Sequence, residues 1–253
     1  MTHFRNWCQI EEESLNKHKV SVLDAHELHT IPAVKLVAKG VPEQYVDGSR
    51  IEKILVRLGR ESAAKMLAAK LPRGAKARSG DLGEILCASY VREETIYQVG
   101  VYKLQWADHR EMAMRGDDIL CFHIDPRTKQ VLILKGEVKS RANLGAVVIN
   151  EARKALSAND GLPSAHSALF VADRLHEIGE SAAATVLDDL FLKNQIRPEQ
   201  VTHMLFTFSG NNPKKLLLKN LQDYSGTIPQ IYVGLRVEKH QAFIKSVFDA
   251  VTL

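Results

Sequence analysis

The stretch RGDDILCFHIDPRTKQVLILKGEVKSR, residues 115–141, decides the fold of this chain. Its two apolar runs, ILCFHI and VLILKGEVKS, have the length and composition of strands, and the turn-forming residues DPRTKQ separate them. The pattern predicts a β-hairpin that supplies the centre of a sheet.

Charged residues occupy the open end of this predicted hairpin. Side chains alternate between the two faces of a strand, so Glu137 and Lys139 point the same way and Val138 points into the opposite layer. When two strands pair through such a turn, the start of the first lies beside the end of the second. Asp118 is then expected next to Glu137, so that two carboxylates and one ammonium group form a cluster.

A cluster of this kind suits a divalent metal and a phosphate. Two neighbouring carboxylates repel each other unless a cation lies between them, and oxygen ligands favour Mg²⁺ or Mn²⁺. With a metal held by Asp118 and Glu137, Lys139 would orient the attacking water and stabilise the charge of the transition state. The sequence therefore predicts phosphodiester hydrolysis. Asp118 is preferred as the ligand because it immediately precedes the apolar run, and its neighbour Asp117 remains an alternative.

Helical and extended patterns alternate along the rest of the chain. Apolar residues at helical spacing predict helices over residues 49–71, 81–94 (with Asp81 as the N-cap), 144–160, 180–195 and 239–251. Short apolar runs predict further strands over residues 20–26, 33–39, 100–106, 167–173, 203–209 and 231–238. Strands separated by helices indicate an α/β fold with helices flanking the sheet, and the hairpin makes that sheet mixed rather than purely parallel.

The segment LPRGAKARSG, residues 71–80, has the glycine and basic residues of a linker or mobile loop. It divides the chain into an N-terminal elaboration, residues 1–79, and a catalytic domain, residues 80–253. We expect the N-terminal part to pack on the catalytic core.

Composition narrows the possible functions. Lysine plus arginine exceed aspartate plus glutamate by only 34 to 30, so the net charge does not identify a nucleic-acid binder. The three cysteines are far apart and form no CxxC pair, which argues against a disulfide framework or a zinc ribbon and favours a reducing cytoplasm. We expect no signal peptide and no membrane span. Walker, GxGxxG and GxSxG motifs are absent from the sequence.

Positive charge is concentrated between Arg57 and Arg78, where Glu61 is the only acidic residue. Contact with phosphates and a solvated helix face both explain this pattern. A smaller cluster comprises Lys214, Lys215 and Lys219. The side chains expected to contact DNA are Arg73, Lys76, Arg78, Arg141, Arg153 and Lys154.

The order of the charged residues resembles the motif of PD-(D/E)xK nucleases, which is a helix glutamate, an aspartate that opens a strand, and an ExK triplet after an apolar strand. The matching residues are Glu84, Asp118, Glu137 and Lys139. The resemblance implies a restriction-endonuclease-like core in which Asp118 and Glu137 hold the metal and Lys139 assists the attacking water. It also implies that Glu84 completes the metal shell or supports it.

A longer pattern, from GDLGEILCASY at residues 80–90 through RGDD to EVKSR, resembles the HamA family, the nuclease subunits of Hachiman antiviral systems. The likeness is good over residues 80–158. It implies a cytoplasmic, magnesium-dependent deoxyribonuclease that acts in a bacterial antiphage complex. It also implies a partner helicase, similar to HamB, that restrains the nuclease until DNA engages the complex.

Two other functions are compatible with the sequence. A catalytically silent nucleic-acid-binding or adaptor module would keep the fold, although unpaired acids in an unused site carry an electrostatic cost. An RNA-directed nuclease would use the same metal chemistry, because the residues do not reveal which backbone is cut.

Overall fold

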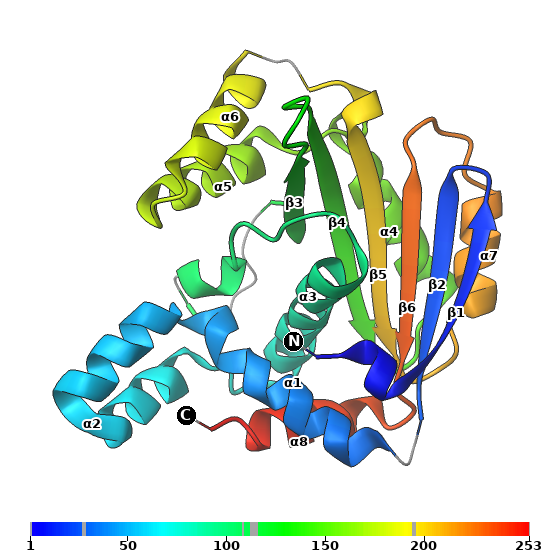
Figure 1. The fold of residues 1–253 in the computed structure, drawn as a ribbon. Helices are drawn as coiled ribbons and strands as arrows, with labels where there is room; N and C mark the ends of the chain where they lie inside the picture. The colour runs from blue at the N-terminus through cyan, green and yellow to red at the C-terminus, as the bar shows by residue number, and fades with distance from the viewer. Residues whose placement is uncertain (1, 27–28, 108, 112–115, 194–195, 253) are drawn as a thin grey trace.

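The computed structural model describes residues 2–26, 29–107, 109–111, 116–193 and 196–252, which form a six-stranded sheet with helices on both faces (Figure 1). The strands are β1 (Cys8–Leu15), β2 (His18–Ala25), β3 (Ile119–Ile124), β4 (Val131–Arg141), β5 (Val201–Ser209) and β6 (Gln230–Arg236). The α-helices are α1 (Thr30–Tyr45), α2 (Gly48–Lys70), α3 (Ala75–Glu94), α4 (Ala146–Ser157), α5 (Ala165–Glu177), α6 (Ser181–Leu192), α7 (Lys214–Gln222) and α8 (His240–Asp249). The predicted α/β class is confirmed.

The sheet is mixed, in the order β1-β2-β6-β5-β4-β3. The two outer pairs, β1 with β2 and β3 with β4, are antiparallel, whereas the three inner pairings are parallel. In the β3–β4 hairpin, Ile119 lies opposite Gly136 and Ile124 lies opposite Val131. The predicted hairpin is therefore confirmed, and parallel pairing of β4 with β5 buries β4 in the sheet.

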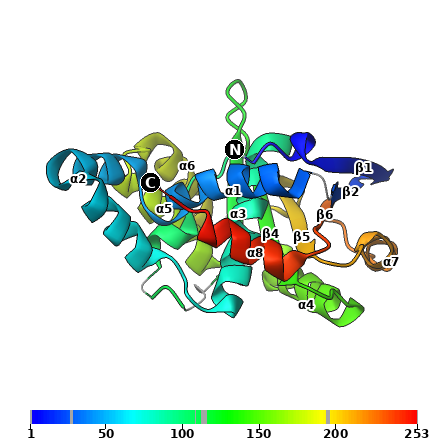
Figure 2. The same cartoon turned by 90° about the horizontal axis from the view of Figure 1, so that it is seen from below.

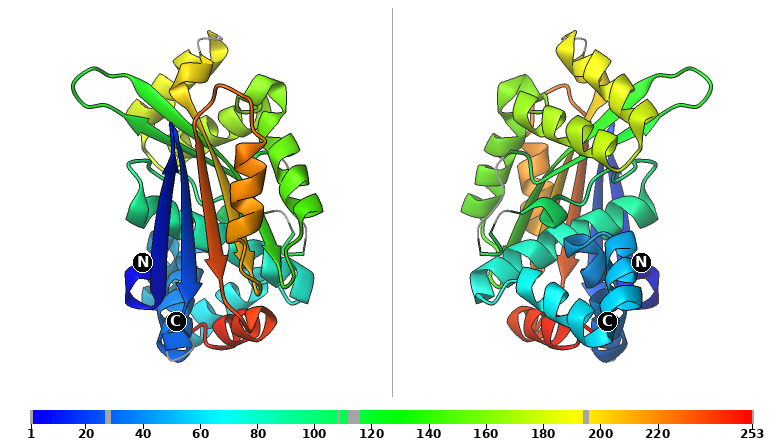
Figure 3. Two further views of the ribbon diagram at one scale, coloured as in Figure 1. Left: turned by 90° about the vertical axis from the view of Figure 1, so that its right-hand side faces the viewer. Right: turned by 90° about the vertical axis from the view of Figure 1, so that its left-hand side faces the viewer.

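Helices cover both faces of the sheet, as Figures 2 and 3 show. Helices α1, α3 and α8 pack on one face, where the largest apolar core includes Leu86, Phe206 and Phe243. Helices α4 and α7 pack on the other face around Leu205 and Tyr232. Helices α5 and α6 form a third layer that packs against the β3–β4 hairpin. Helix α2 projects from the body of the molecule in Figure 1 and bends at Gly59, whose φ is +81°.

Two predicted strands are helices in the structure. Residues 33–39 belong to α1, whose apolar residues Ala33, Val37 and Val41 are buried at a spacing of four. Pro32 does not break this helix because it lies in the first turn, where its missing N–H costs nothing. Residues 167–173 belong to α5, whose first turn is capped by Ser164.

The predicted linker over residues 71–80 is also partly wrong. Helix α3 begins at Ala75, so Asp81 lies inside the helix and is not its N-cap. The Asp81 carboxylate instead accepts a hydrogen bond of 2.6 Å from the hydroxyl of Tyr45. The proposed domain boundary at residues 79 and 80 falls within this helix, and strands β1 and β2 of the N-terminal part continue the same sheet.

The predicted strand over residues 100–106 is a 3-10 helix, η3 (Lys103–Trp106), after an irregular segment. Pairing with the sheet edge is limited to an isolated bridge between Gln98 and Phe122. Strand β1 and helix α7 were not predicted, because β1 is acidic and largely exposed and α7 begins with the lysine cluster. Arg115 and residues 194–195 of the predicted 180–195 helix lie outside the described residues. Within the described ranges, no helix is long and apolar enough to cross a membrane.

Candidate active site

The β3–β4 hairpin brings Asp118 beside the end of β4, as the sequence predicts. Asp118 immediately precedes β3, and its Oδ2 accepts a hydrogen bond of 2.8 Å from the backbone N–H of Val138. Because Val138 lies between Glu137 and Lys139, this bond fixes the Asp118 carboxylate next to the ExK triplet. Burial raises the pKa of Asp118, although the Val138 N–H and the charge of Lys139 oppose that shift.

Glu137 and Lys139 share one face of β4 and form an ion pair. The Lys139 Nζ lies 2.5 Å from the Glu137 Oε1, and the two side chains are 22% and 14% exposed. Burial and the neighbouring Asp118 carboxylate raise the pKa of Glu137, while Lys139 lowers it. The pair is therefore partly removed from water but still reachable by a ligand.

Glu84 reaches the same acidic cluster from the other side of the strand pair, on helix α3. Gly83 lets this helix approach β4 closely, because a Cβ atom at Gly83 would lie 3.1 Å from the Cγ1 of Val138. Burial, followed by the charge of Asp118, raises the pKa of Glu84 to about 8. The helix glutamate expected from the superfamily resemblance thus lies within electrostatic reach of Asp118 and Glu137.

We refer to Glu84, Asp118 and Glu137 together as the acidic cluster. All three have raised pKa values because they are desolvated and because each is close to another carboxylate. A divalent cation would relieve this repulsion, and carboxylate oxygens are its preferred ligands. Among the described residues, however, no three His, Cys, Asp or Glu side chains already lie close enough together to hold a metal ion. Carboxylate oxygens are the ligand type that Mg²⁺ and Mn²⁺ prefer, and a metal at the acidic cluster stays a prediction.

Asp117, the alternative ligand, has other partners. Its carboxylate accepts hydrogen bonds from the N–H and hydroxyl of Ser164, at 3.0 and 3.3 Å. It also lies 3.8 Å from the Nζ of Lys135, which is 2% exposed in its side chain. These contacts connect β3 to the start of α5. They occupy Asp117 and leave Asp118 as the aspartate of the acidic cluster.

Lys103 is a site residue that sequence reasoning did not identify. It lies at the start of η3, and its Nζ donates a hydrogen bond of 2.9 Å to the backbone carbonyl of Asp117. Its positive charge lowers the pKa values of both Glu84 and Asp118. The segment was predicted to be a strand, and no motif spacing connects it to the hairpin.

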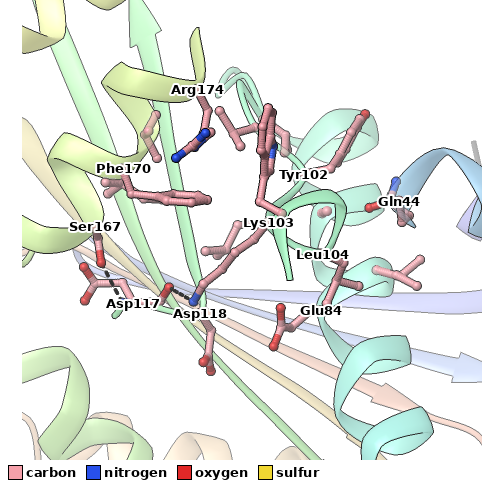
Figure 4. A pocket seen from close by; sticks show the side chains of 18 of the residues that line it. Gln44, Glu84, Tyr102, Lys103, Leu104, Asp117, Asp118, Ser167, Phe170 and Arg174 are labelled. Carbon is pink, nitrogen blue, oxygen red and sulfur yellow. Dashed lines mark hydrogen bonds between the residues drawn. The ribbon is translucent and has the colours of Figure 1, made fainter. Parts of the chain in front are cut away.

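A cavity of about 630 Å³ opens beside the acidic cluster. Figure 4 shows Glu84, Lys103 and Asp118 at one end of it, and Phe170 and Arg174 at the other. Trp106 also lines the cavity, and the Arg174 guanidinium lies 4.4 Å from the centre of its ring. No sequence pattern indicates this cavity, because part of its wall comes from η3 and α5, both predicted as strands.

The residues expected to contact DNA occupy different surroundings. Arg73, Lys76, Arg141 and Lys154 are exposed. Arg78 is half-buried, with its guanidinium over the ring of Phe248, and Arg153 donates to the hydroxyl of Tyr232 and to Gln230. A role in DNA contact stays a prediction for all six.

The fold and the site define an α/β protein with a mixed sheet that is consistent with a nuclease-like core. A model of the HamA family matches residues 1–251. The chain is also similar to the Hachiman protein HamA of Bacillus cereus, with 28% identity over 254 residues that cover 97% of this chain and 89% of the relative. The chain belongs to the HamA family.

Proposed function

We propose that this protein is a metal-dependent deoxyribonuclease and the effector of a Hachiman antiphage defence complex. The acidic cluster beside Lys139, at the open end of the β3–β4 hairpin, carries the proposal. Three desolvated carboxylates near one another destabilise a protein unless a ligand uses them. The relative from Bacillus cereus is named as a Hachiman protein, which supports the antiphage setting.

Each residue of the site has a distinct role in the proposed reaction. A bound Mg²⁺ would supply Lewis acidity for the phosphate oxygen and the attacking water. Asp118 is held in place by the Val138 N–H and, with Glu137 and Glu84, provides oxygen ligands. Lys139 orients the attacking water and stabilises the negative charge that develops on the phosphate. The ion pair with Glu137 keeps the Lys139 ammonium at this position before substrate binds.

We also propose restraint by a partner helicase, and membership of a defence-system family supports a partner of some kind. A nuclease that acts on any DNA endangers its own cell, so its activity must depend on a second event. We propose that a helicase subunit withholds DNA from the acidic cluster until it engages foreign or damaged DNA. Co-purification of a helicase with the tagged protein, under mild salt, is the expected observation.

The direct test incubates the protein on plasmid DNA with Mg²⁺, with and without its co-expressed partner. Wild type should cleave, and Glu137→Gln and Lys139→Met should cleave far more slowly. The matched control is Asp189→Asn with Lys193→Met, which removes an exposed acid and lysine pair, 3.1 Å apart, from α6. Equal behaviour of wild type and the site variants, without metal binding, would favour the silent adaptor module.

The same protein preparation tests whether the substrate is DNA or RNA. Labelled DNA and RNA of equal length are compared at one salt concentration, because phosphate contacts weaken as salt rises. We expect cleavage of DNA. Preferential cleavage of RNA would assign the site to an RNA-directed nuclease.

A further inference from the structure

The wall of the cavity opposite the acidic cluster is aromatic and cationic. The Arg174 guanidinium lies 4.4 Å from the centre of the Trp106 ring and 5.4 Å from that of Phe170. Phe170 and Arg174 are four residues apart on α5, so they lie on the same face of that helix. Trp106 comes from η3, and the three side chains join the two elements on either side of the cavity.

Arg174 carries a buried hydrogen-bond donor that has no partner. Its NH1 pairs with Glu177 at 2.5 Å, whereas its Nε is buried and has no hydrogen-bond partner. A buried donor without a partner is costly, so the protein itself does not fully satisfy the Arg174 guanidinium. Nucleobases carry carbonyl oxygens, and their flat faces stack on aromatic rings and guanidinium groups.

The cavity has the size and the position for one nucleotide. Its volume of about 630 Å³ lies in the range of small-molecule sites. Glu84, Asp118 and Lys103 line the opposite end, where the phosphate of a nucleotide would meet two of the three proposed metal ligands. A paired base within a duplex is stacked on both sides and cannot present its face to this wall.

We propose that this cavity binds an unpaired nucleobase of single-stranded DNA, which stacks on Phe170 and Trp106 and contacts Arg174. This proposal rests on the proposed nuclease function, and it narrows the substrate to DNA that is single-stranded or frayed at the site of cleavage. The cavity wall holds the base, and the DNA backbone then directs the phosphate of that nucleotide to the acidic cluster.

Tryptophan fluorescence tests the proposal without requiring cleavage. The chain has two tryptophans, and Trp7 is only 2% exposed whereas Trp106 lines the cavity. The Lys139→Met protein, in a metal chelator, is titrated with a short oligodeoxythymidine and with a blunt duplex. The single strand should quench the fluorescence and the duplex should not. Loss of this quenching in Trp106→Phe would assign it to the cavity.

Substitutions in the cavity wall test the proposal a second time, through the affinity for single-stranded DNA. Phe170→Leu keeps an apolar side chain but removes the aromatic face, and it should weaken binding of the oligodeoxythymidine roughly 5- to 150-fold. Arg174→Lys keeps the charge but loses the planar group, and it should weaken binding as well. Leu169→Ala is the matched control, because Leu169 is the neighbouring residue on α5, is 41% exposed and does not line the cavity.

The outcomes separate this proposal from the nuclease function. Quenching by single-stranded DNA in a protein that never cleaves DNA would support the base-binding cavity and overturn the nuclease. Cleavage of duplex and single strand at equal rates, unchanged by Phe170→Leu and Arg174→Lys, would overturn the cavity and leave the nuclease. Quenching that persists in Trp106→Phe would also overturn the cavity.

Discussion

Strand β4 carries two charged regions that differ in how well their surroundings satisfy them. Lys135 is 1% exposed and donates hydrogen bonds of 3.0 Å to the carbonyls of Leu156, Ala158 and Leu162, with Asp117 3.8 Å away. At the end of the same strand, Glu137 and Lys139 form an ion pair with each other, and burial and the Asp118 carboxylate raise the pKa of Glu137.

The difference separates a structural charge from a functional one. The Lys135 ammonium binds the C-terminal carbonyls of α4, where a cation is favourable, and connects them to β3 through Asp117. In the acidic cluster, burial disfavours charges that the protein itself does not neutralise. We infer that Lys135 and its partners stabilise the fold. The acidic cluster, in contrast, lowers stability and serves ligand binding.

The largest expected effect is on stability, in Lys135→Met. This change leaves Asp117 and three carbonyls without their buried cation and should lower the free energy of unfolding by about 3–5 kcal/mol. Urea denaturation followed by circular dichroism measures it. Lys154→Met, at an exposed lysine of α4, should change stability by less than about 0.5 kcal/mol. A loss of equal size in both variants would contradict the structural role of Lys135.

The second prediction concerns Lys139, the other lysine of β4, and contrasts it with Lys135. Lys139→Met should reduce DNA cleavage by about 10²–10³-fold, because a donor to the transition state is lost. Its free energy of unfolding should fall by less than about 1 kcal/mol, because the ion pair with Glu137 is partly exposed. Cleavage rates and urea curves are measured on the same preparation. A large loss of stability in Lys139→Met with little loss of activity would contradict a functional role for Lys139.

The third prediction concerns Glu84, whose pKa is raised to about 8 by burial and Asp118. The folded state keeps its proton to a higher pH than the unfolded state, so stability falls as pH rises from about 4.5 to 8. Glu84→Gln should remove this dependence and stabilise the metal-free protein by up to about 4 kcal/mol at pH 8. Thermal unfolding across this pH range measures it. Glu43→Gln is the control, because Glu43 is an exposed glutamate of α1.

The same preparation tests the metal ligands. Mg²⁺ at 100 times its dissociation constant should stabilise the wild type by about 2.7 kcal/mol. Glu84→Gln should gain less from Mg²⁺ because it has lost a ligand and part of the repulsion. An equal gain in both proteins would exclude Glu84 from the metal shell.

The smallest expected effect concerns His203, a neighbour of the Lys135 region. Burial lowers its pKa to about 4, and its Nε2 lies 2.8 Å from the carbonyl of Gly161. The unfolded state then binds the extra proton first, so stability is present above about pH 6.5 and is lost as pH falls towards 4. His203→Gln should lower this acid sensitivity by about 1–2 kcal/mol, as measured by urea unfolding between pH 4 and 7. An acid dependence identical to that of the wild type would contradict it.

Local sequence was sufficient for the hairpin and its charged end. The apolar runs on either side of DPRTKQ fix the strands, and the alternation of a strand fixes the shared face of Glu137 and Lys139. The position of Asp118 beside the ExK triplet followed from antiparallel pairing and is found in the structure. Three predicted strands, residues 33–39, 100–106 and 167–173, are helical or irregular in the structure, and apolar content alone does not separate buried helices from strands, as α1 and α5 show.

Only the tertiary structure decided which elements meet at the site. Glu84 approaches Asp118 because Gly83 lets α3 contact β4, and Lys103 reaches the backbone of Asp117 from η3, where a strand was expected. The partners of Asp117, Ser164 and Lys135, are also distant from it in sequence, and Asp118 as the metal ligand stays a prediction. Sequence fixes side-chain direction within one element through its backbone period, whereas contacts between elements depend on packing that the local pattern does not contain.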